Sequence, residues 1–154
     1  MQHSTAFLIV EAIGLQLAAM ARQQGVLHLD NPALPLNLRY VDEKRDRAIF
    51  HLQAGDRLLG KPGQRDQRSV RILVGAAALT EKSRRDADAL HFLARMAMRG
   101  DAWRAVVRAQ VGQELAAGPA REVDIEGQLT AVTTEGAGFI SAFEIEYQQP
   151  YPVA

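Results

Sequence analysis

The side chains best suited to chemistry in this chain are its four histidines, which are widely separated: His3, His28, His51 and His91. None lies at a metal-ligand spacing from another histidine, and the chain contains no cysteine. Cysteine-based zinc sites, thiol nucleophiles and disulfide scaffolds are therefore excluded. The apolar neighbours of His91 predict a position at a helix surface or core edge, and alternation with core residues predicts that His51 faces solvent. No metal site is expected.

Acid–base chemistry has one candidate pair, His51 and Asp56, but nothing in the sequence brings a nucleophile to them. Gly55, Gly60 and Gly63 have neither the spacing nor the helix start of a phosphate-binding loop, so no cofactor is predicted. The sequence thus predicts no catalytic residues and a protein that is not an enzyme.

Charged residues offer binding chemistry instead. Arg84 and Arg85 at a helix start could hold an anion, although the acidic residues that follow them could neutralise them. Glu144 and Glu146 are two apart in a predicted strand and so point the same way. They could act as an acid–base pair, but a solvated sheet face or an interface with a basic surface is the commoner role of such residues.

Residues 54–68 are polar, with three glycines, one proline and a basic excess, which predicts a long mobile loop. Such a loop is either a hairpin tip or a contact arm for a partner subunit or nucleic acid. Its four cations and the two strand carboxylates are the candidate oligomer or partner contacts: Arg57, Lys61, Arg65, Arg68, Glu144 and Glu146.

The elements that would position these groups centre on residues 69–100. Val70, Ile72 and Val74 alternate with Arg71 and Leu73, which predicts a half-buried strand. Apolar residues then recur at helical spacing, beginning at a possible Ser83–Asp86 capping box and ending before Gly100. The stripe comprises Ala87, Leu90, Leu93, Ala94 and Ala97, widened by Ala89, Phe92 and Met96. So wide an apolar stripe must lie on a sheet.

The N-terminal half contributes a second helix over residues 5–24, closed by Gly25. A buried core helix is the preferred interpretation. A signal or membrane anchor is the alternative, opposed by Glu11 and by the lack of a preceding cation. Alternating residues then predict strands over 36–40 and 48–53, joined by a charged turn into a hairpin.

The C-terminal third predicts a helix over 101–111, although the same residues alternate tolerably as a strand. Strands over 122–132 and 139–148 follow, forming a hairpin around a glycine-containing turn. Phe139, Phe143, Ile145 and Tyr147 share one face of the last strand.

The chain has 154 residues, 47% of them hydrophobic, and 18 basic against 18 acidic residues. This suits a single domain with a substantial core, and the zero net charge disfavours a general or sequence-specific nucleic-acid binder. The predicted fold is α+β: a mostly antiparallel sheet of about four to five strands, covered on one face by two or three helices.

The order of elements resembles the tail terminator (tail completion, head–tail joining) proteins of long-tailed bacteriophages and prophages. The residues that carry the likeness are the strand at 70–74, the helix at 86–98 and the closing aromatic–acidic run from Phe143 to Tyr147. The resemblance implies a non-enzymatic subunit of a hexameric ring in the virion, assembled in the bacterial host cytoplasm. It also implies contacts with the tail tube and head connector, and no membrane partner.

Three rival roles fit the same sequence: another head-closure or connector protein, a small cytoplasmic ligand-binding domain or enzyme, and a membrane-anchored periplasmic domain. The second would need a polar pocket lined by His51, Asp56 or Arg71. The third depends on the first helix acting as a signal.

Overall fold

The computed structural model describes residues 3–38, 46–61, 63, 65–112, 117–125 and 131–150. Its helices and strands are, in chain order, α1 (Thr5–Gln24), β1 (Leu27–Asp30), β2 (Arg47–Gly60), β3 (Arg65–Ala78), α2 (Ser83–Arg99), α3 (Ala102–Val111), β4 (Arg121–Val123) and β5 (Ala137–Pro150).

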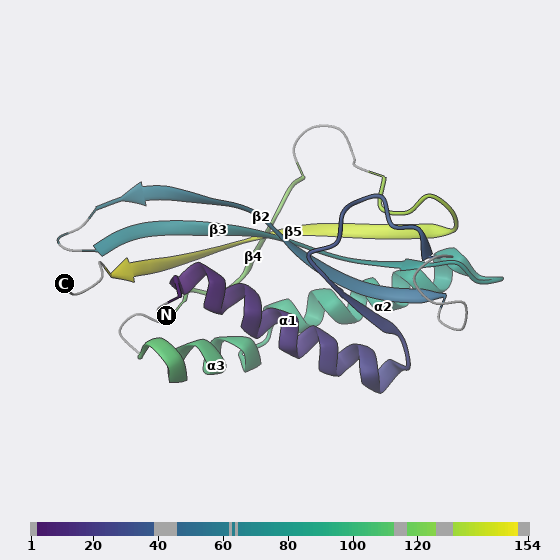
Figure 1. Ribbon diagram of the computed structural model, residues 1–154, viewed down its shortest axis with the longest axis horizontal. Helices are drawn as coiled ribbons and strands as arrows, with labels where there is room; N and C mark the ends of the chain where they lie inside the picture. The colour runs from purple at the N-terminus through teal and green to yellow at the C-terminus, as the bar shows by residue number, and fades with distance from the viewer. Residues whose placement is uncertain are drawn as a thin grey trace.

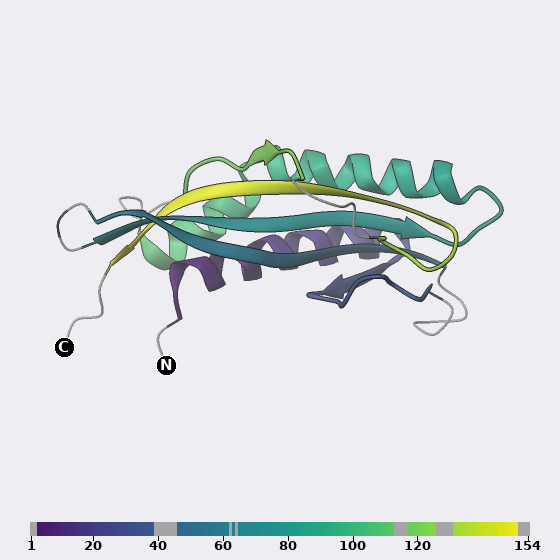
Figure 2. The same ribbon diagram turned by 90° about the horizontal axis from the view of Figure 1, so that it is seen from above.

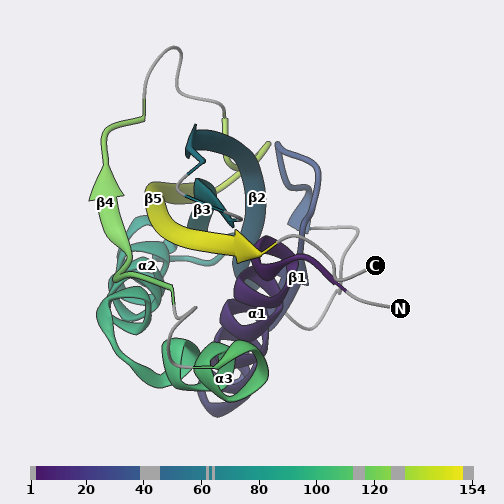
Figure 3. The same cartoon turned by 90° about the vertical axis from the view of Figure 1, so that its left-hand side faces the viewer.

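The strands form one sheet in the order β1-β2-β3-β5-β4, and all neighbours are antiparallel except β1 and β2. The three helices lie on one face of this sheet, as the end-on view shows (Figure 3). The predicted α+β class, with a mostly antiparallel sheet, is confirmed.

The central strand and helix form as predicted, with longer bounds. Val70, Ile72 and Val74 are fully buried in β3, and the strand continues to Ala78. The capping box is wrong: Ser83 is the first helical residue, and its hydroxyl accepts from the Thr80 N–H and donates to the Thr80 carbonyl. Asp86 instead accepts a 2.7 Å hydrogen bond from the Thr80 hydroxyl, so the side chains brace the turn before the helix.

The apolar stripe of α2 is narrower than predicted on one side. Phe92 and Met96 are exposed, whereas His91 and Met98 turn inward. His91 Nε2 lies 2.8 Å from the Ser141 hydroxyl, and this hydrogen bond offsets the cost of burying the imidazole. His91 thus lies at the core edge, as predicted. The exposed pair lies on the solvent side of a helix whose core contact is made largely by alanines.

Helix α1 has the predicted bounds and ends as predicted. Gly25 adopts φ 68°, a left-handed conformation, and its N–H donates to carbonyls of the last turn. Ile9, Ile13 and Leu17 are at most 1% exposed, so this is a core helix of the fold. By length and composition alone it could also cross a membrane, and half of its most apolar window is buried here.

The residues 101–111 that could have been helix or strand form helix α3 from Ala102 to Val111, and this third helix packs mainly against α1. Trp103, the only tryptophan, is buried and donates its indole N–H to the carbonyl of Met98 at 3.1 Å. Because that carbonyl belongs to the last turn of α2, the bond fixes the angle between the two helices.

The predicted strand over 36–40 and its hairpin with the next strand are wrong for the described residues. β2 is flanked by β1 and β3, so neither edge of its first half is free for another strand. Leu36 makes a single bridge to Thr133, and Leu38 is buried beside it. Both leucines belong to a second core on the face opposite the helices. Residues 39–45 lie outside the described part of the chain.

That second core explains why β2 is buried on both faces from Ala48 to His51. Ile49 and His51 face α1, whereas Ala48 and Phe50 join the opposite cluster with Leu36. The sheet is therefore buried on both faces at this end.

The predicted loop over 54–68 is also corrected. Residues 54–60 continue β2 and 65–68 begin β3, paired in register with irregularities at Gln53/Gly55 and Leu58/Gly60. β5 pairs with β3 along all 14 residues, so three strands run side by side to one end of the sheet (Figures 1 and 2). We call the outer part of these strands, residues 54–60, 65–70 and 145–150, the arm. Its β2 residues are exposed as far as Leu59, whereas Val70, Ile145 and Tyr147 still belong to the core under the helices.

The C-terminal pairing is confirmed only over three residues. β4 covers Arg121–Val123 and pairs antiparallel with β5 at residues 142–144. Residues 124–125 and 131–132 are not strand, so the predicted strand over 122–132 and its hairpin around the glycine-containing turn are wrong for the described residues; residues 126–130 lie outside them. Arg95 of α2 donates two hydrogen bonds of 2.9 and 3.1 Å to the Glu122 carboxylate, and this bidentate pair links the short edge strand to the helix.

Candidate functional site

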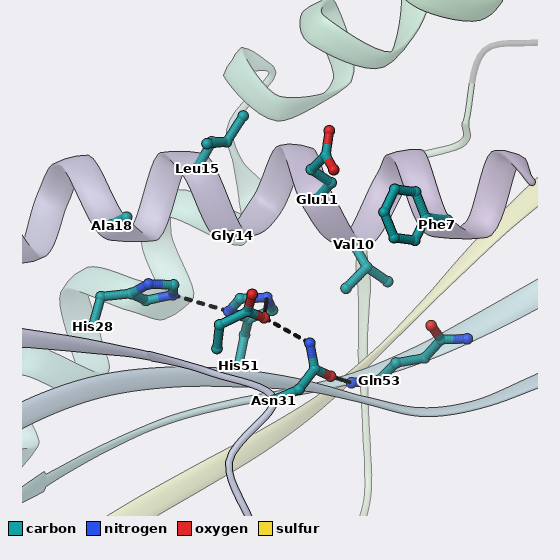
Figure 4. Close-up of a pocket in the computed structure, with 11 residues that line it drawn as sticks. Phe7, Val10, Glu11, Gly14, Leu15, Ala18, His28, Asn31, His51 and Gln53 are labelled. Carbon is teal, nitrogen blue, oxygen red and sulfur yellow. Dashed lines mark hydrogen bonds and ion pairs between the residues drawn. The ribbon is translucent and has the colours of Figure 1, made fainter. Parts of the chain in front are cut away.

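A cavity of about 320 Å³ lies between α1 and the β1 edge of the sheet (Figure 4). One wall is the outer side of α1 and is mainly apolar; the floor is polar and comes from β1, β2 and the residue after β1. The lining residues are Phe7, Val10, Glu11, Gly14, Leu15, Ala18, His28, Asp30, Asn31, His51 and Gln53.

Two histidines from neighbouring strands form the centre of the floor. The parallel register pairs His28 with Ile49 and Asp30 with His51, so both imidazoles rise on the α1 side. The rings stack with centroids 5.0 Å apart and planes 7° from parallel, and His28 Nε2 lies 3.0 Å from His51 Nδ1. His51 is 1% exposed, so the prediction that it faces solvent is wrong.

Gly14 lets α1 approach this pair closely. A Cβ at position 14 would lie 2.8 Å from His51 Cε1 and 2.9 Å from His51 Nε2, closer than real Cβ contacts come. The absence of a side chain at this helix position is therefore what allows the helix to cover the imidazole.

Asp30 and Asn31 complete the polar floor. Asp30 Oδ1 lies 3.3 Å from His51 Nε2 and accepts a 2.6 Å hydrogen bond from Asn31 Nδ2. Asn31, at φ 49°, donates its N–H to the His51 carbonyl and accepts from the Gln53 N–H at 2.9 Å. This side chain thus substitutes for the next residue of β1 where the strand stops.

Both histidines of the floor are held neutral. Burial lowers the pKa of His51 to about 4, with a further decrease from His28, and Asp30 only partly opposes it. Burial likewise lowers the pKa of His28. In the neutral state, His28 Nε2–H can donate to His51 Nδ1, and His51 Nε2–H can donate to the Asp30 carboxylate. Each donor then faces an acceptor.

The groups that line this cavity are suited to recognising a ligand. No serine, threonine, cysteine or lysine lines the cavity among the described residues. Nor do the described residues contain a cluster of three or more His, Cys, Asp or Glu side chains able to hold a metal ion. The site offers an apolar wall, a neutral polar floor and two carboxylates, Glu11 and Asp30.

The expected pair of His51 and Asp56 does not form. Asp56 lies further along β2 and accepts a 2.7 Å hydrogen bond from the Tyr147 hydroxyl and a 3.2 Å hydrogen bond from Arg68. Burial and that hydrogen bond raise the pKa of Tyr147. Asp56 thus ties β2 to β5 across β3, and its role is structural.

The six predicted contact residues all lie on the arm or at its base, on two different faces. Arg57 and Glu144 share the face away from the helices, 3.7 Å apart, and Arg121 approaches the same carboxylate at 3.2 Å. Arg68 lies on the other face with Asp56 and Asp66. Glu144, with 15% of its side chain exposed, is more buried than predicted.

The remaining three predicted contacts are near the arm's outer end or its edge. Arg65 donates to Gln148 at 3.2 Å, Glu146 is exposed, and Lys61 is exposed just after β2. Sequence reasoning missed the cavity residues His28 and Asp30. The alternation of Leu27-His-Leu-Asp30 was the signal, but a run of four residues is too short to stand out.

No protein-family model matches this sequence, and no curated protein matches it significantly.

Proposed function

We propose that this chain is a non-enzymatic assembly protein of a long-tailed phage or prophage, forming a ring that ends the tail tube and joins it to the head. The proposal combines the resemblance of its element order to tail terminator proteins with one feature of the fold, the arm. A ring of this kind works by binding and needs no chemical step.

The observation that carries the proposal is the open edge of the arm. β1 pairs with β2 only as far as His51, so among the described residues no strand pairs with the edge of β2 opposite β3 from Gln53 to Gly60. An open strand edge presents unpaired N–H and C=O groups that another chain can bind. The arm also carries charges of both signs, including Arg65, Arg68 and Glu146.

Self-assembly into a ring requires two unlike, complementary surfaces on each subunit, related by a rotation that closes. β2 is exposed from Gln53 to Leu59, so a neighbour can bind this edge of the arm without disturbing the subunit's own core. A head-closure protein would need the same geometry. The fold therefore does not distinguish these two roles, and only the identity of the binding partner does.

The test is the native mass across a wide range of concentration and salt, by light scattering after size exclusion, with electron microscopy of any large species. We expect closed rings of about six subunits that bind one end of the phage's own tail tube. A protein that stays monomeric at every concentration and ignores the tube would overturn the proposal.

A second candidate function, small-ligand binding, is favoured by the His28–His51 cavity. Pockets for small molecules span about 300–1,000 Å³, and this one is at the lower limit. A thermal-shift screen separates the two: a ligand that raises the melting temperature of the parent and not of His51→Gln would support this alternative.

A further inference from the structure

Two surfaces of this chain expose large apolar side chains beside charges of opposite sign. The first is the cavity wall on α1, where Phe7 is 42% and Leu15 63% exposed; we call it the α1 groove. The second is the end of β2, Arg57–Lys61, where Leu58 is 46% and Leu59 41% exposed; we call it the arm tip.

The α1 groove is acidic. Glu11 and Asp30 line it, its two histidines are neutral, and no lysine or arginine is among its described lining residues. Glu11 makes no ion pair with another described residue, and the Asp30 side chain is 73% exposed. The groove therefore suits an apolar side chain that arrives with a cation beside it.

The arm tip has that composition. Leu58 and Leu59 are consecutive residues at the register irregularity of β2, and both are exposed, so the tip is apolar. Arg57 and Lys61 flank them, and Lys61 has no ion-pair partner among the described residues. An exposed apolar pair at the end of a strand with an open edge is otherwise an aggregation hazard.

The tip cannot reach the groove of its own chain. Gln53 lines the groove, and Leu58 lies five residues further along the same strand, about 16 Å away at 3.3 Å per residue. β2 is held extended by its pairing with β3 through this stretch, so the tip points away from α1. A second copy of the chain is the occupant that places this tip in that groove.

We propose that the arm tip of one copy docks in the α1 groove of the next, with a leucine against Phe7 and Leu15 and Lys61 facing Glu11. This inference rests on the proposed ring function and identifies its contact surfaces. The groove volume of about 320 Å³ has room for one or two side chains. Because groove and tip are different surfaces of one chain, the contact is heterologous and repeats from copy to copy.

The experiment uses two variants and their mixture. Leu15→Glu blocks the groove, and the double variant Leu58→Glu/Leu59→Glu blocks the tip; all three positions are exposed, so the core is undisturbed. Each variant alone should need at least about tenfold more protein to assemble. Phe92→Glu, on the 54%-exposed side chain of α2, is the matched control and should assemble like the parent.

Mixing the two blocked variants gives the decisive readout. One chain keeps an intact tip and the other an intact groove, so an equimolar mixture should form a dimer and nothing larger. Charge reversal adds a second measurement: Glu11→Lys and Lys61→Glu should each weaken assembly, and the two combined in one chain should restore much of it.

The outcomes separate the docking contact from the ring itself. If the parent assembles and the groove and tip variants assemble equally well, the docking contact is wrong and the proposed function stands. If the parent never self-associates, both are overturned. A blocked-variant mixture that forms large species would also refute the contact, because it would show that assembly uses other surfaces.

Discussion

The two ends of the long strands β2, β3 and β5 are paired alike but buried differently. At the covered end, both faces of the sheet are buried, with Ile72 and Phe143 under the helices and Phe50 in the opposite cluster. At the arm end, the same backbone pairing continues with exposed leucines and arginines. Along β2 the pairing thus extends past the core that stabilises it, and this edge of the arm is left free to present contact chemistry.

The largest test of this contrast is truncation of a core side chain at the covered end. Phe143 is fully buried, so Phe143→Ala should lower the free energy of unfolding by about 3–5 kcal/mol, through lost burial and the cavity left behind. Chemical denaturation monitored through Trp103 measures the loss. The arm counterpart, Leu59→Ala, should cost less than about 1 kcal/mol. Equal losses would mean that the exposed end of β2 stabilises the fold as much as the core does.

Acidification tests the buried imidazoles at the covered end. The pKa of His51 falls from 6.5 to about 4 on folding, so the unfolded chain binds more protons between these values. Stability is full above pH 6.5 and decreases as pH falls toward about 4, by up to roughly 3 kcal/mol at about 1.4 kcal/mol per pKa unit.

The control for that pH dependence is His51→Gln, which keeps a polar side chain and cannot titrate. Its free energy of unfolding should change less steeply with pH over the same interval, measured by urea denaturation at a series of pH values. The remaining slope reports His28, His91 and the carboxylates. An unchanged slope would show that His51 is not the group that takes up the proton.

Two glycines in the same pair of strands give a matched comparison. A Cβ at Gly75 would meet Phe50 and the Phe139 carbonyl, whereas a Cβ at Gly55 on the arm would meet nothing within 4 Å. Gly75→Ala should therefore cost about 1–3 kcal/mol through overpacking. Gly55→Ala should be neutral or stabilising by up to about 1 kcal/mol, because it restricts the unfolded chain. The midpoints of thermal unfolding of the two variants measure this difference. The reverse order would show that the covered end repacks around the added methyl group.

Sequence patterns predicted the parts of the fold in which one face is apolar. α1, α2 and the core of β3 have strong periodicity, and their placement was right. Residues 54–60 and 65–68 of the arm were missed as strands because they have little apolar alternation, and a glycine-rich polar run is typical of loops. Pairing with β3, which no local pattern encodes, makes residues 54–60 a strand.

The candidate site was missed for a related reason. Placing His51 in solvent assumed that β2 has one wet face, because Ala48, Phe50 and Leu52 alternate with it. Both faces are buried here, one by α1 and the other by the cluster around Leu36. The cluster around Leu36 covers the face that carries Ala48 and Phe50, and α1 covers the face that carries His51. Which segment covers each face depends on tertiary structure, which the local pattern does not encode.

The smallest expected effects are at the arm's charged face, where two arginines share one carboxylate. Arg57 is 3.7 Å and Arg121 3.2 Å from Glu144, and both arginine side chains are about two-thirds exposed. Arg57→Ala or Arg121→Ala alone should change the free energy of unfolding by less than about 0.5 kcal/mol, because exposed pairs are weak and the other arginine remains. The double variant leaves a partly buried Glu144 without either partner and should lose more than the sum of the two single changes. A double-mutant cycle measures that difference, and strict additivity would show that the two arginines act independently and that the arm's charges are available to a partner.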